Sequence, residues 1–412
     1  MQGKVTAETS DPVGSRRAIF AKVPKRVKWL IYLTSFSAVG YGYLFVFISA
    51  YLPELGLGTG YVGLLLGVTG ATFVISAIPL GMLSDRRGRK PILFFGLFAL
   101  PPSLLVFALT TNVVYLVVAG IVAGVAEGAY LTTWNAIIAD QTTPENRDAA
   151  FSLSFIIGNV AMGLGFVVPV FFPGIHAWTG LDSHTIHFGT LAILALLGLV
   201  TPITLMSLLK GYQDVGRSDK RSLRGRNMRP LLKFSGINSL IGLGAGFIIP
   251  LIPTWLFLKF GVADTYSGPL LAVANVTIGL AAFVSSALSR RFGQVRTIVM
   301  TQSLSMGFML SLAFAPTAMI AGGVYLVRAA LMNMSSPIAD SFLMGIISPE
   351  DRGLASAINT LFWRLPNSAT TIAGGMILAS GNYDLPIFLA TAFYVVSISL
   401  FYITFKEVKP SG

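Results

Sequence analysis

The sequence contains no cysteine and few charges. The absence of cysteine from all 412 residues excludes disulfides, thiolate metal sites and cysteine nucleophiles. Only 11% of the residues are charged, against about 25% in an ordinary soluble domain. With 54% hydrophobic residues, a water-soluble fold would lack the polar side chains to cover its surface. A soluble enzyme, a nucleic-acid-binding protein and a disordered chain are therefore poor interpretations, and the net charge of +12 suits a membrane surface as well as DNA.

Two further shortages narrow the chemistry. No loop of the G-x-x-x-x-G-K-S/T type is present, which argues against ATP as an energy source. The chain has only three histidines, and all of them fall in one short stretch outside the long apolar runs. We interpret them as residues of a solvated loop rather than metal ligands: His176, His184 and His187.

Long apolar runs fill most of the chain. A helix needs about 20 residues to cross a bilayer, and twelve runs are long enough. Their continuous apolarity argues against a β-barrel, whose strands alternate apolar and polar residues. The sequence therefore predicts an all-α polytopic membrane protein with twelve transmembrane helices. They are expected at 29–52, 61–83, 91–111, 113–138, 149–172, 187–209, 231–258, 267–288, 295–314, 317–346, 353–380 and 385–405.

Lysine and arginine gather in alternate loops. Nearly all of the 29 basic residues lie near the termini or after even-numbered spans, the exceptions being Lys259, Arg328 and Arg364. Because basic loops remain in the cytoplasm, we expect a cell-membrane protein with both termini cytoplasmic. Residues 1–28 lack the apolar centre and cleavage pattern of a signal peptide, so we interpret them as a cytoplasmic tail.

Three short motifs recur 205 residues apart, each at the same place in a six-span half. Tyr61-Val62-Gly63 matches Tyr266-Ser267-Gly268, Leu83 to Gly88 matches Leu288 to Gly293, and Pro144 to Arg147 matches Pro349 to Arg352. This agreement predicts a duplicated chain whose halves have the same orientation. The predicted units are a tail (1–28), a first bundle (29–209), a basic linker (210–230), a second bundle (231–405) and a tail (406–412).

The loop from Gly81 to Lys90, with the sequence GMLSDRRGRK, resembles the signature motif of the major facilitator superfamily. The second copy of this loop and the two Pro-Glu-x-Arg loops also resemble that family, and the resemblance covers residues 29–405. It implies two six-helix bundles that transport a solute by alternating access. It is specific for the superfamily and says little about the substrate.

The same resemblance implies a conformational latch. In the family, the aspartate that matches Asp85 faces the start of helix 11, which lies near Gly353 here, and the arginine that matches Arg89 pairs with an acid such as Asp140. A carboxylate at a helix N-terminus is stabilised by roughly 0.3–1 kcal/mol. Gly88 allows a tight turn. The latch would hold the cytoplasmic side shut in the outward-facing state; the alternative is a basic loop without a conformational role.

Three charges lie well inside predicted spans: Glu127, Arg328 and Arg364. Inserting one charged side chain at the bilayer centre costs roughly 2.5–3.5 kcal/mol, so each of these residues is a candidate for function. The repeat places Glu127 and Arg328 on equivalent faces of helices 4 and 10. The family resemblance implies that these helices line a central cavity, so we expect both residues to reach it and meet across it. We expect Glu127 to couple transport to protons. The alternative is a packing ion pair within one bundle, with Asp340 as the partner of Arg364.

Other polar and aromatic side chains share these spans. Asn359, Trp363 and Asn367 follow one helix face beside Arg364. The predicted substrate-binding residues are Arg328, Arg364, Asn359, Trp363, Asn333 and Tyr43. Further candidates lie on spans 1, 7 and 8: Tyr32, Tyr41, Asn238, Trp255 and Asn275.

The sequence thus predicts a secondary active transporter of a small organic solute, anionic or carboxylate-bearing, driven by proton symport and needing no cofactor. An exporter of amphipathic drugs or lipid-like compounds is the alternative within transport. It is weakened because span 5 lacks the Gly-Pro-x-x-Gly-Gly element of proton-driven drug antiporters. A non-transporting receptor and a membrane enzyme are the alternatives outside transport. The expected partners are a small-molecule substrate and the lipid bilayer, with no nucleic acid, and the expected working unit is a monomer.

Overall fold

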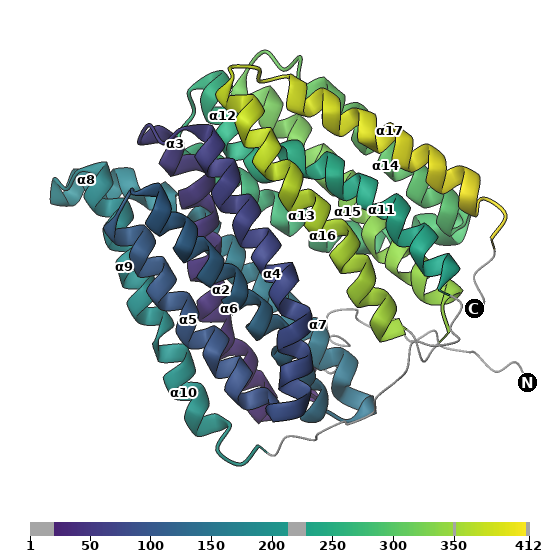
Figure 1. Ribbon diagram of the computed structural model, residues 1–412, viewed down its shortest axis with the longest axis horizontal. Coiled ribbons are helices and arrows are strands. Elements are labelled where there is room, and N and C mark those ends of the chain that lie inside the picture. The colour runs from purple at the N-terminus through teal and green to yellow at the C-terminus, as the bar shows by residue number, and fades with distance from the viewer. Residues whose placement is uncertain (1–19, 213–227, 349–351, 409–412) are drawn as a thin grey trace, which may run out of the picture.

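The computed structural model describes residues 20–212, 228–348 and 352–408, apart from the side chains of 144, 278–283, 286 and 353. Within these ranges the chain forms helices joined by short turns, with no strand (Figure 1). The tails, the linker and the Pro349 motif that were predicted from the sequence lie partly or wholly outside the described residues.

The first half contains six helical spans, and three of them change helix type or direction along their length. They are α2 (Lys25–Val46) continued by η1 (Phe47–Tyr51) and α3 (Leu52–Glu54); α4 (Thr59–Arg87); α5 (Arg89–Leu109); α6 (Val113–Asp140); α7 (Pro144–Val167) continued by η2 (Val168–Phe171) and α8 (Phe172–Thr179); and α9 (Ser183–Gly198) continued by α10 (Val200–Leu208).

The second half repeats this arrangement. Its spans are α11 (Arg229–Ile248) continued by η3 (Ile249–Leu251) and α12 (Ile252–Phe260); α13 (Asp264–Phe292); α14 (Gln294–Leu312); α15 (Ala318–Ile346); α16 (Arg352–Ala379); and α17 (Leu385–Phe405). The predicted fold of twelve helices in two bundles is confirmed.

Local capping explains where two predicted limits were wrong. Span 5 begins at Pro144 rather than 149, because Thr143 and Asn146 form a capping box. Span 6 begins at Ser183 rather than 187, because the Asp182 side chain accepts the Thr185 N–H. His187 therefore lies on a helix and not in a loop.

Nine of the described spans are long and apolar enough to cross a membrane by composition alone. Of the other three, α14 and α16 are more polar and include Gln302 and Arg364, while α13 contains Asn275 and the undescribed side chains of 278–283. Asn275 donates to the Asn159 carbonyl of α7, Gln302 donates to Ser335 of α15, and Arg364 lines the cavity. Their polarity therefore reflects groups that face protein or the cavity.

Small residues set how closely the helices pack. Gly120, Gly124 and Gly128 lie one turn apart on α6, and a Cβ at each would meet the side chains or backbone of α4 at 3.0 Å or less. This spacing lets two helix backbones approach closely, as is common within membranes. It fixes the position of Glu127 relative to α4.

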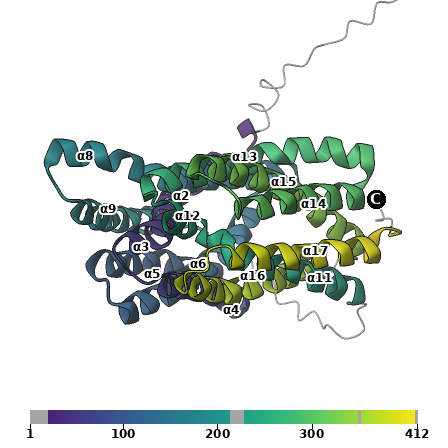
Figure 2. The same ribbon diagram turned by 90° about the horizontal axis from the view of Figure 1, so that it is seen from above.

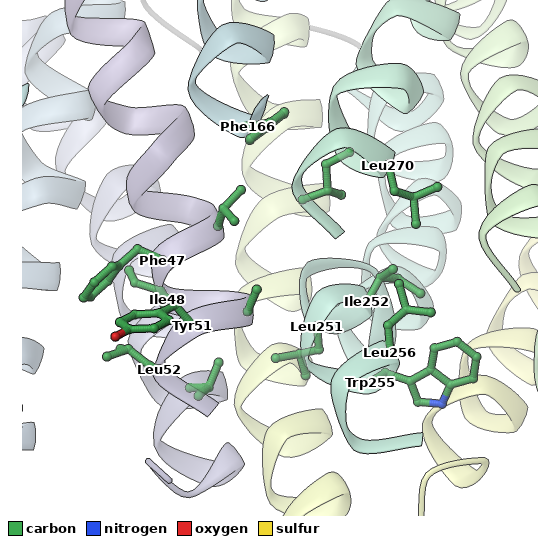
Figure 3. Close-up of a cluster of buried hydrophobic side chains, with 14 of the residues drawn as sticks. Phe47, Ile48, Tyr51, Leu52, Phe166, Leu251, Ile252, Trp255, Leu256 and Leu270 are labelled. Atoms are coloured by element: carbon green, nitrogen blue, oxygen red, sulfur yellow. The ribbon is translucent and has the colours of Figure 1, made fainter. Parts of the chain in front are cut away.

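The two halves touch at one end of the molecule, which we call the sealed end. There, α4 packs on α16 (Figure 2), and α7 packs on α13. Gly63 lies against Gly375, and Thr254 Oγ1 donates to the Ser49 carbonyl at 2.5 Å. Apolar side chains from η1 and α3 lie opposite those of η3 and α12 (Figure 3).

The opposite end carries the arginine-rich turns, and we call it the basic end. Gly88 joins α4 directly to α5 with φ 97°, and Gly293 joins α13 to α14 with φ 80°. Gly293 is the repeat partner of Gly88, and the two glycines form the same kind of tight turn between two helices. Only glycine adopts such a backbone conformation easily.

Candidate functional site

A cavity with two lobes lies between the sealed end and the basic end. The larger lobe, about 850 Å³, is lined mainly by α11, α15 and α16 of the second half. The smaller lobe, about 600 Å³, lies among α2, α5, α6 and α7 of the first half. Both lobes are lined by Leu131, Phe155 and Arg364. A third space, about 150 Å³, continues from Arg364 toward the sealed end.

Arg364 and Glu127 face each other where the lobes meet. Arg364 Nη1 lies 3.9 Å from Glu127 Oε1, and the two side chains are 40% and 22% exposed. Tyr41 Oη donates to Glu127 Oε2 at 2.6 Å, and the guanidinium lies 4.4 Å from the Phe73 ring centroid. The pair is therefore an ion pair between the two halves, partly open to water and held by an aromatic ring on each side.

Glu127 does not pair with Arg328 in this structure, contrary to the expectation from the repeat. Helix α16 crosses α4 and brings Arg364 across to α6, whereas Arg328 is directed into its own half. Asp340 is also not the partner of Arg364. The carboxylate within ion-pair distance of Arg364 is that of Glu127, and Asp340 forms no ion pair with another described residue.

Arg328 is buried in the wall of the larger lobe, with 5% of its surface exposed. One terminal nitrogen donates to Tyr394 Oη at 2.6 Å, and the guanidinium lies 5.6 Å from the ring centroid of that tyrosine. Its Nε has no hydrogen-bond partner. Among the described residues no carboxylate forms an ion pair with it.

The predicted residues Asn333, Asn359 and Trp363 also line the larger lobe. Asn359 Oδ1 accepts from Asn238 Nδ2 at 3.0 Å, so α16 is tied to α11 at this point. Asn367 donates to the Gly242 carbonyl at 3.2 Å and serves helix packing as well. These amides give the larger lobe a polar lining beside two arginines.

Tyr43 does not line the cavity, and its prediction as a substrate contact is corrected. It is fully buried near the sealed end, where its ring packs edge-on against Phe172. Tyr41 contacts Glu127 instead. Residues two apart on a helix point in nearly opposite directions, so a small error in the assumed cavity face exchanges one tyrosine for the other. Trp255 is likewise buried, donating to the Tyr383 carbonyl at 3.0 Å.

The sequence analysis missed the aromatic wall of the smaller lobe. Tyr130 and Trp134 stack with ring centroids 5.7 Å apart, and Phe151 and Phe155 complete the wall. Tyr130 and Trp134 follow Glu127 at i+3 and i+7, and that spacing on one helix face was the available signal.

Part of the predicted latch is formed within the first half. Arg89 pairs with Asp140, and Asp140 also accepts from Tyr212 Oη at 2.6 Å. Burial and this hydrogen bond raise the pKa of Tyr212. Asp85 is exposed, and no hydrogen bond or ion pair joins it to another described residue. Its predicted contact with the start of helix 11 remains a prediction for another conformation.

His187 corrects another expectation, because it is not a solvated loop residue. Its side chain is 3% exposed at the sealed end, and its Nε2 lies 2.8 Å from Asp264 Oδ2 of the second half. The expected span limit at 187 had placed it at a helix start next to a loop. His176 and His184 are exposed.

Comparison with known proteins gives one consistent family. The profile of the Major Facilitator Superfamily matches residues 30–237 and 234–412. The class H tetracycline resistance protein of Pasteurella multocida is 27% identical, over 80% of this chain and 83% of that protein. The multidrug resistance protein MdtG of Dickeya zeae is 25% identical, over 89% of this chain and 90% of that protein.

Solved structures agree on the fold. A bacterial homologue of the human lysosomal transporter Spinster, in an inward-facing and occupied conformation, superposes with a TM-score of 0.74 at 15% identity. The match covers 93% of this chain and 98% of that one.

Proposed function

The chain belongs to the Major Facilitator Superfamily of membrane transporters, and from this premise we propose that it exports amphipathic organic compounds. The observation that carries the proposal is the smaller lobe, an aromatic-walled space of about 600 Å³ with a single carboxylate, Glu127. Aromatic faces beside a carboxylate, with Arg364 at the border of the lobe, suit a compound that has a flat apolar body and a polar handle. Two relatives named for tetracycline and multidrug resistance support the exporter over the anion symporter.

The basic end faces the cytoplasm in this proposal, because basic loops remain on that side. Both termini are then cytoplasmic, and the described conformation is inward-facing, since the close backbone contacts between the halves lie toward the sealed end and the Glu127–Arg364 ion pair bridges the halves beside the cavity. Export requires the sealed end to open and the basic end to close. Asp85 would then reach the start of α16, which is the state in which the latch acts. The protein works in the cell membrane as a monomer and needs no cofactor.

Glu127 is the proposed proton site. When ionised, it attracts Arg364 across the two halves; when protonated, it loses that attraction and keeps only the Tyr41 contact. A cationic compound competes with the proton for the carboxylate, so the two would bind alternately. That competition couples export of a cation to proton entry.

A second candidate function is proton-linked uptake of an organic anion, and Arg328 favours it. A buried guanidinium without a carboxylate partner is costly unless an anion accompanies it. An anion bound near Arg364 would also weaken its attraction for Glu127 and favour protonation there. Anion and proton would then load together, as in symport.

Two dyes with the same ring system separate the candidates. Rhodamine 6G is cationic and fluorescein carries a carboxylate, and both are followed by fluorescence in proteoliposomes with an imposed pH gradient. The exporter hypothesis expects rhodamine 6G to move opposite to the protons. Fluorescein moving with the protons, while rhodamine 6G is not transported, would refute the exporter and support the second candidate.

A further inference from the structure

A buried polar cluster joins the two halves at the sealed end, and its residues are not among those that line the cavity. His187 of α9 contacts Asp264 at the start of α13, and both side chains are 3% exposed. Glu54 Oε1 of α3 accepts the Asp264 backbone N–H at 2.8 Å. The imidazole stacks on the Tyr51 ring with centroids 3.4 Å apart, and Tyr51 lies in the apolar cluster of Figure 3.

The hydrogen bonds of His187 fix how many protons the cluster holds. Nδ1 lies 2.7 Å from the Ser183 carbonyl, which can only accept, and 3.3 Å from the Ser183 hydroxyl, which can donate or accept. The shorter contact favours a hydrogen on Nδ1. A neutral imidazole then has a bare Nε2, yet Nε2 lies 2.8 Å from a carboxylate oxygen. Two lone pairs cannot face each other at that distance. One more proton must lie between them, whether on the imidazole or on the carboxyl group.

We propose that His187 and Asp264 form a proton-binding site whose occupancy closes the sealed end. The site holds one proton more than a neutral histidine and an ionised aspartate would hold when separated. The titratable groups facing it are Glu54 on α3, Tyr51 on η1 and Tyr43 on α2. When it is ionised, the carboxylate of Glu54 favours retention of the proton.

The direction of the pH effect follows from this count. The closed state binds more protons than the open one, so acid favours closure and alkali favours opening. For one linked proton, the ratio of closed to open molecules changes by at most about tenfold per pH unit. The inference rests on the alternating-access mechanism proposed above. The proton enters and leaves this site from the side of the membrane that the sealed end faces. It therefore controls when the sealed end opens, but it is not itself carried across the membrane.

The test measures the distance across the sealed end directly. The chain has no cysteine, so Leu181→Cys and Ser380→Cys give two unique spin-label sites on exposed residues of different halves. Electron–electron distances are recorded in lipid nanodiscs at about pH 5 and about pH 8, the range in which histidine commonly titrates. A Glu127→Gln background removes the carboxyl group of the smaller lobe, and a Glu127→Gln/Asp340→Asn background also removes that of the larger lobe. We expect the short-distance fraction to rise toward acid pH.

Three variants make the expectation specific. Asp264→Asn should stay closed at both pH values, because an amide N–H can donate to a bare Nε2 without an added proton. His187→Gln should also lose the pH dependence, since its amide pairs with the carboxylate and does not titrate. His187→Phe keeps a ring on Tyr51 and loses the pair, so it should favour the long distance at both pH values.

Each contrary result has a distinct meaning. A pH dependence that survives in Asp264→Asn or His187→Gln would overturn the proton site. Distances that do not respond to pH in the Glu127→Gln background, but respond to rhodamine 6G when Glu127 is intact, would also overturn it and leave the transport mechanism standing. A single distance under all conditions, including His187→Phe, would contradict both the site and alternating access.

Discussion

A substitution at Gly63 should shift the equilibrium between the closed and the open sealed end of this transporter. A Cβ at this position would lie 2.7 Å from the Thr371 carbonyl oxygen and 2.8 Å from Gly375 Cα. Both are backbone atoms, so the clash cannot be relieved by a side-chain rotation. Gly63→Ala should therefore destabilise the closed sealed end, while an open sealed end, in which α4 and α16 separate, leaves room for the methyl group.

The magnitude follows from the cost of overpacking, typically about 1–3 kcal/mol. Applied to one of two conformations, this energy shifts their ratio by about 5- to 150-fold. Thr254→Cys supplies the reporter, because Thr254 is fully buried and its hydroxyl bonds to Ser49 of the other half. Maleimide labelling of this thiol, in a chain otherwise without cysteine, should accelerate in Gly63→Ala by a factor within that range.

Gly60→Ala is the matched control on the same helix. Its Cβ would lie 3.9 Å from the Ala379 Cβ, an ordinary contact, so labelling should match the parent. Size-exclusion profiles and melting temperatures verify that each variant is folded. If Gly63→Ala and Gly60→Ala label at the same rate, the closed interface between α4 and α16 does not limit opening and the reasoning is wrong.

Three further substitutions test the cavity and the latch. Glu127→Gln should abolish accumulation driven by a pH gradient and retain counterflow exchange; continued accumulation would show that the proton binds elsewhere. Arg364→Lys keeps the charge but loses the planar guanidinium over Phe73, so under the second candidate function the affinity for the anionic dye fluorescein should fall about tenfold, and unchanged affinity with a lower melting temperature would indicate a purely structural role. Asp85→Asn should leave the melting temperature of the described conformation unchanged, since Asp85 is exposed there, yet reduce transport; full transport would contradict the latch.

The sequence predicts the fold well because its signals are local or periodic. Apolar runs of sufficient length identify helices one by one, and the arginine pattern orders their ends. The residues of the site were found by a different argument, the cost of placing Glu127, Arg328 and Arg364 in an apolar run. That argument identifies the charges but not their partners. Partners depend on how helices cross, and the crossing of α16 over α4 decides that Arg364 meets Glu127.

Features at helix boundaries were the least predictable. His187 was assigned to a loop because the expected span began at that residue, whereas Asp182 caps the helix one turn earlier. The Asp264 partner then lies 77 residues away in the other half, and no local pattern connects them. Tyr41 and Tyr43 lie on nearly opposite faces of one helix. Because that helix is apolar on most faces, hydropathy alone does not show which tyrosine faces the cavity.

The repeat carried more structural information than any single motif, and the glycines explain why. Gly63 and Gly268 end the two copies of the Tyr-x-Gly motif, and each lies at a contact between halves. Gly63 meets α16, and a Cβ at Gly268 would lie 2.3 Å from the Phe166 carbonyl of α7. A residue without a side chain is needed wherever two backbones must approach closely and later separate. The duplicated glycines therefore mark both seams of the sealed end, and their near-symmetry means that opening must release the two seams together.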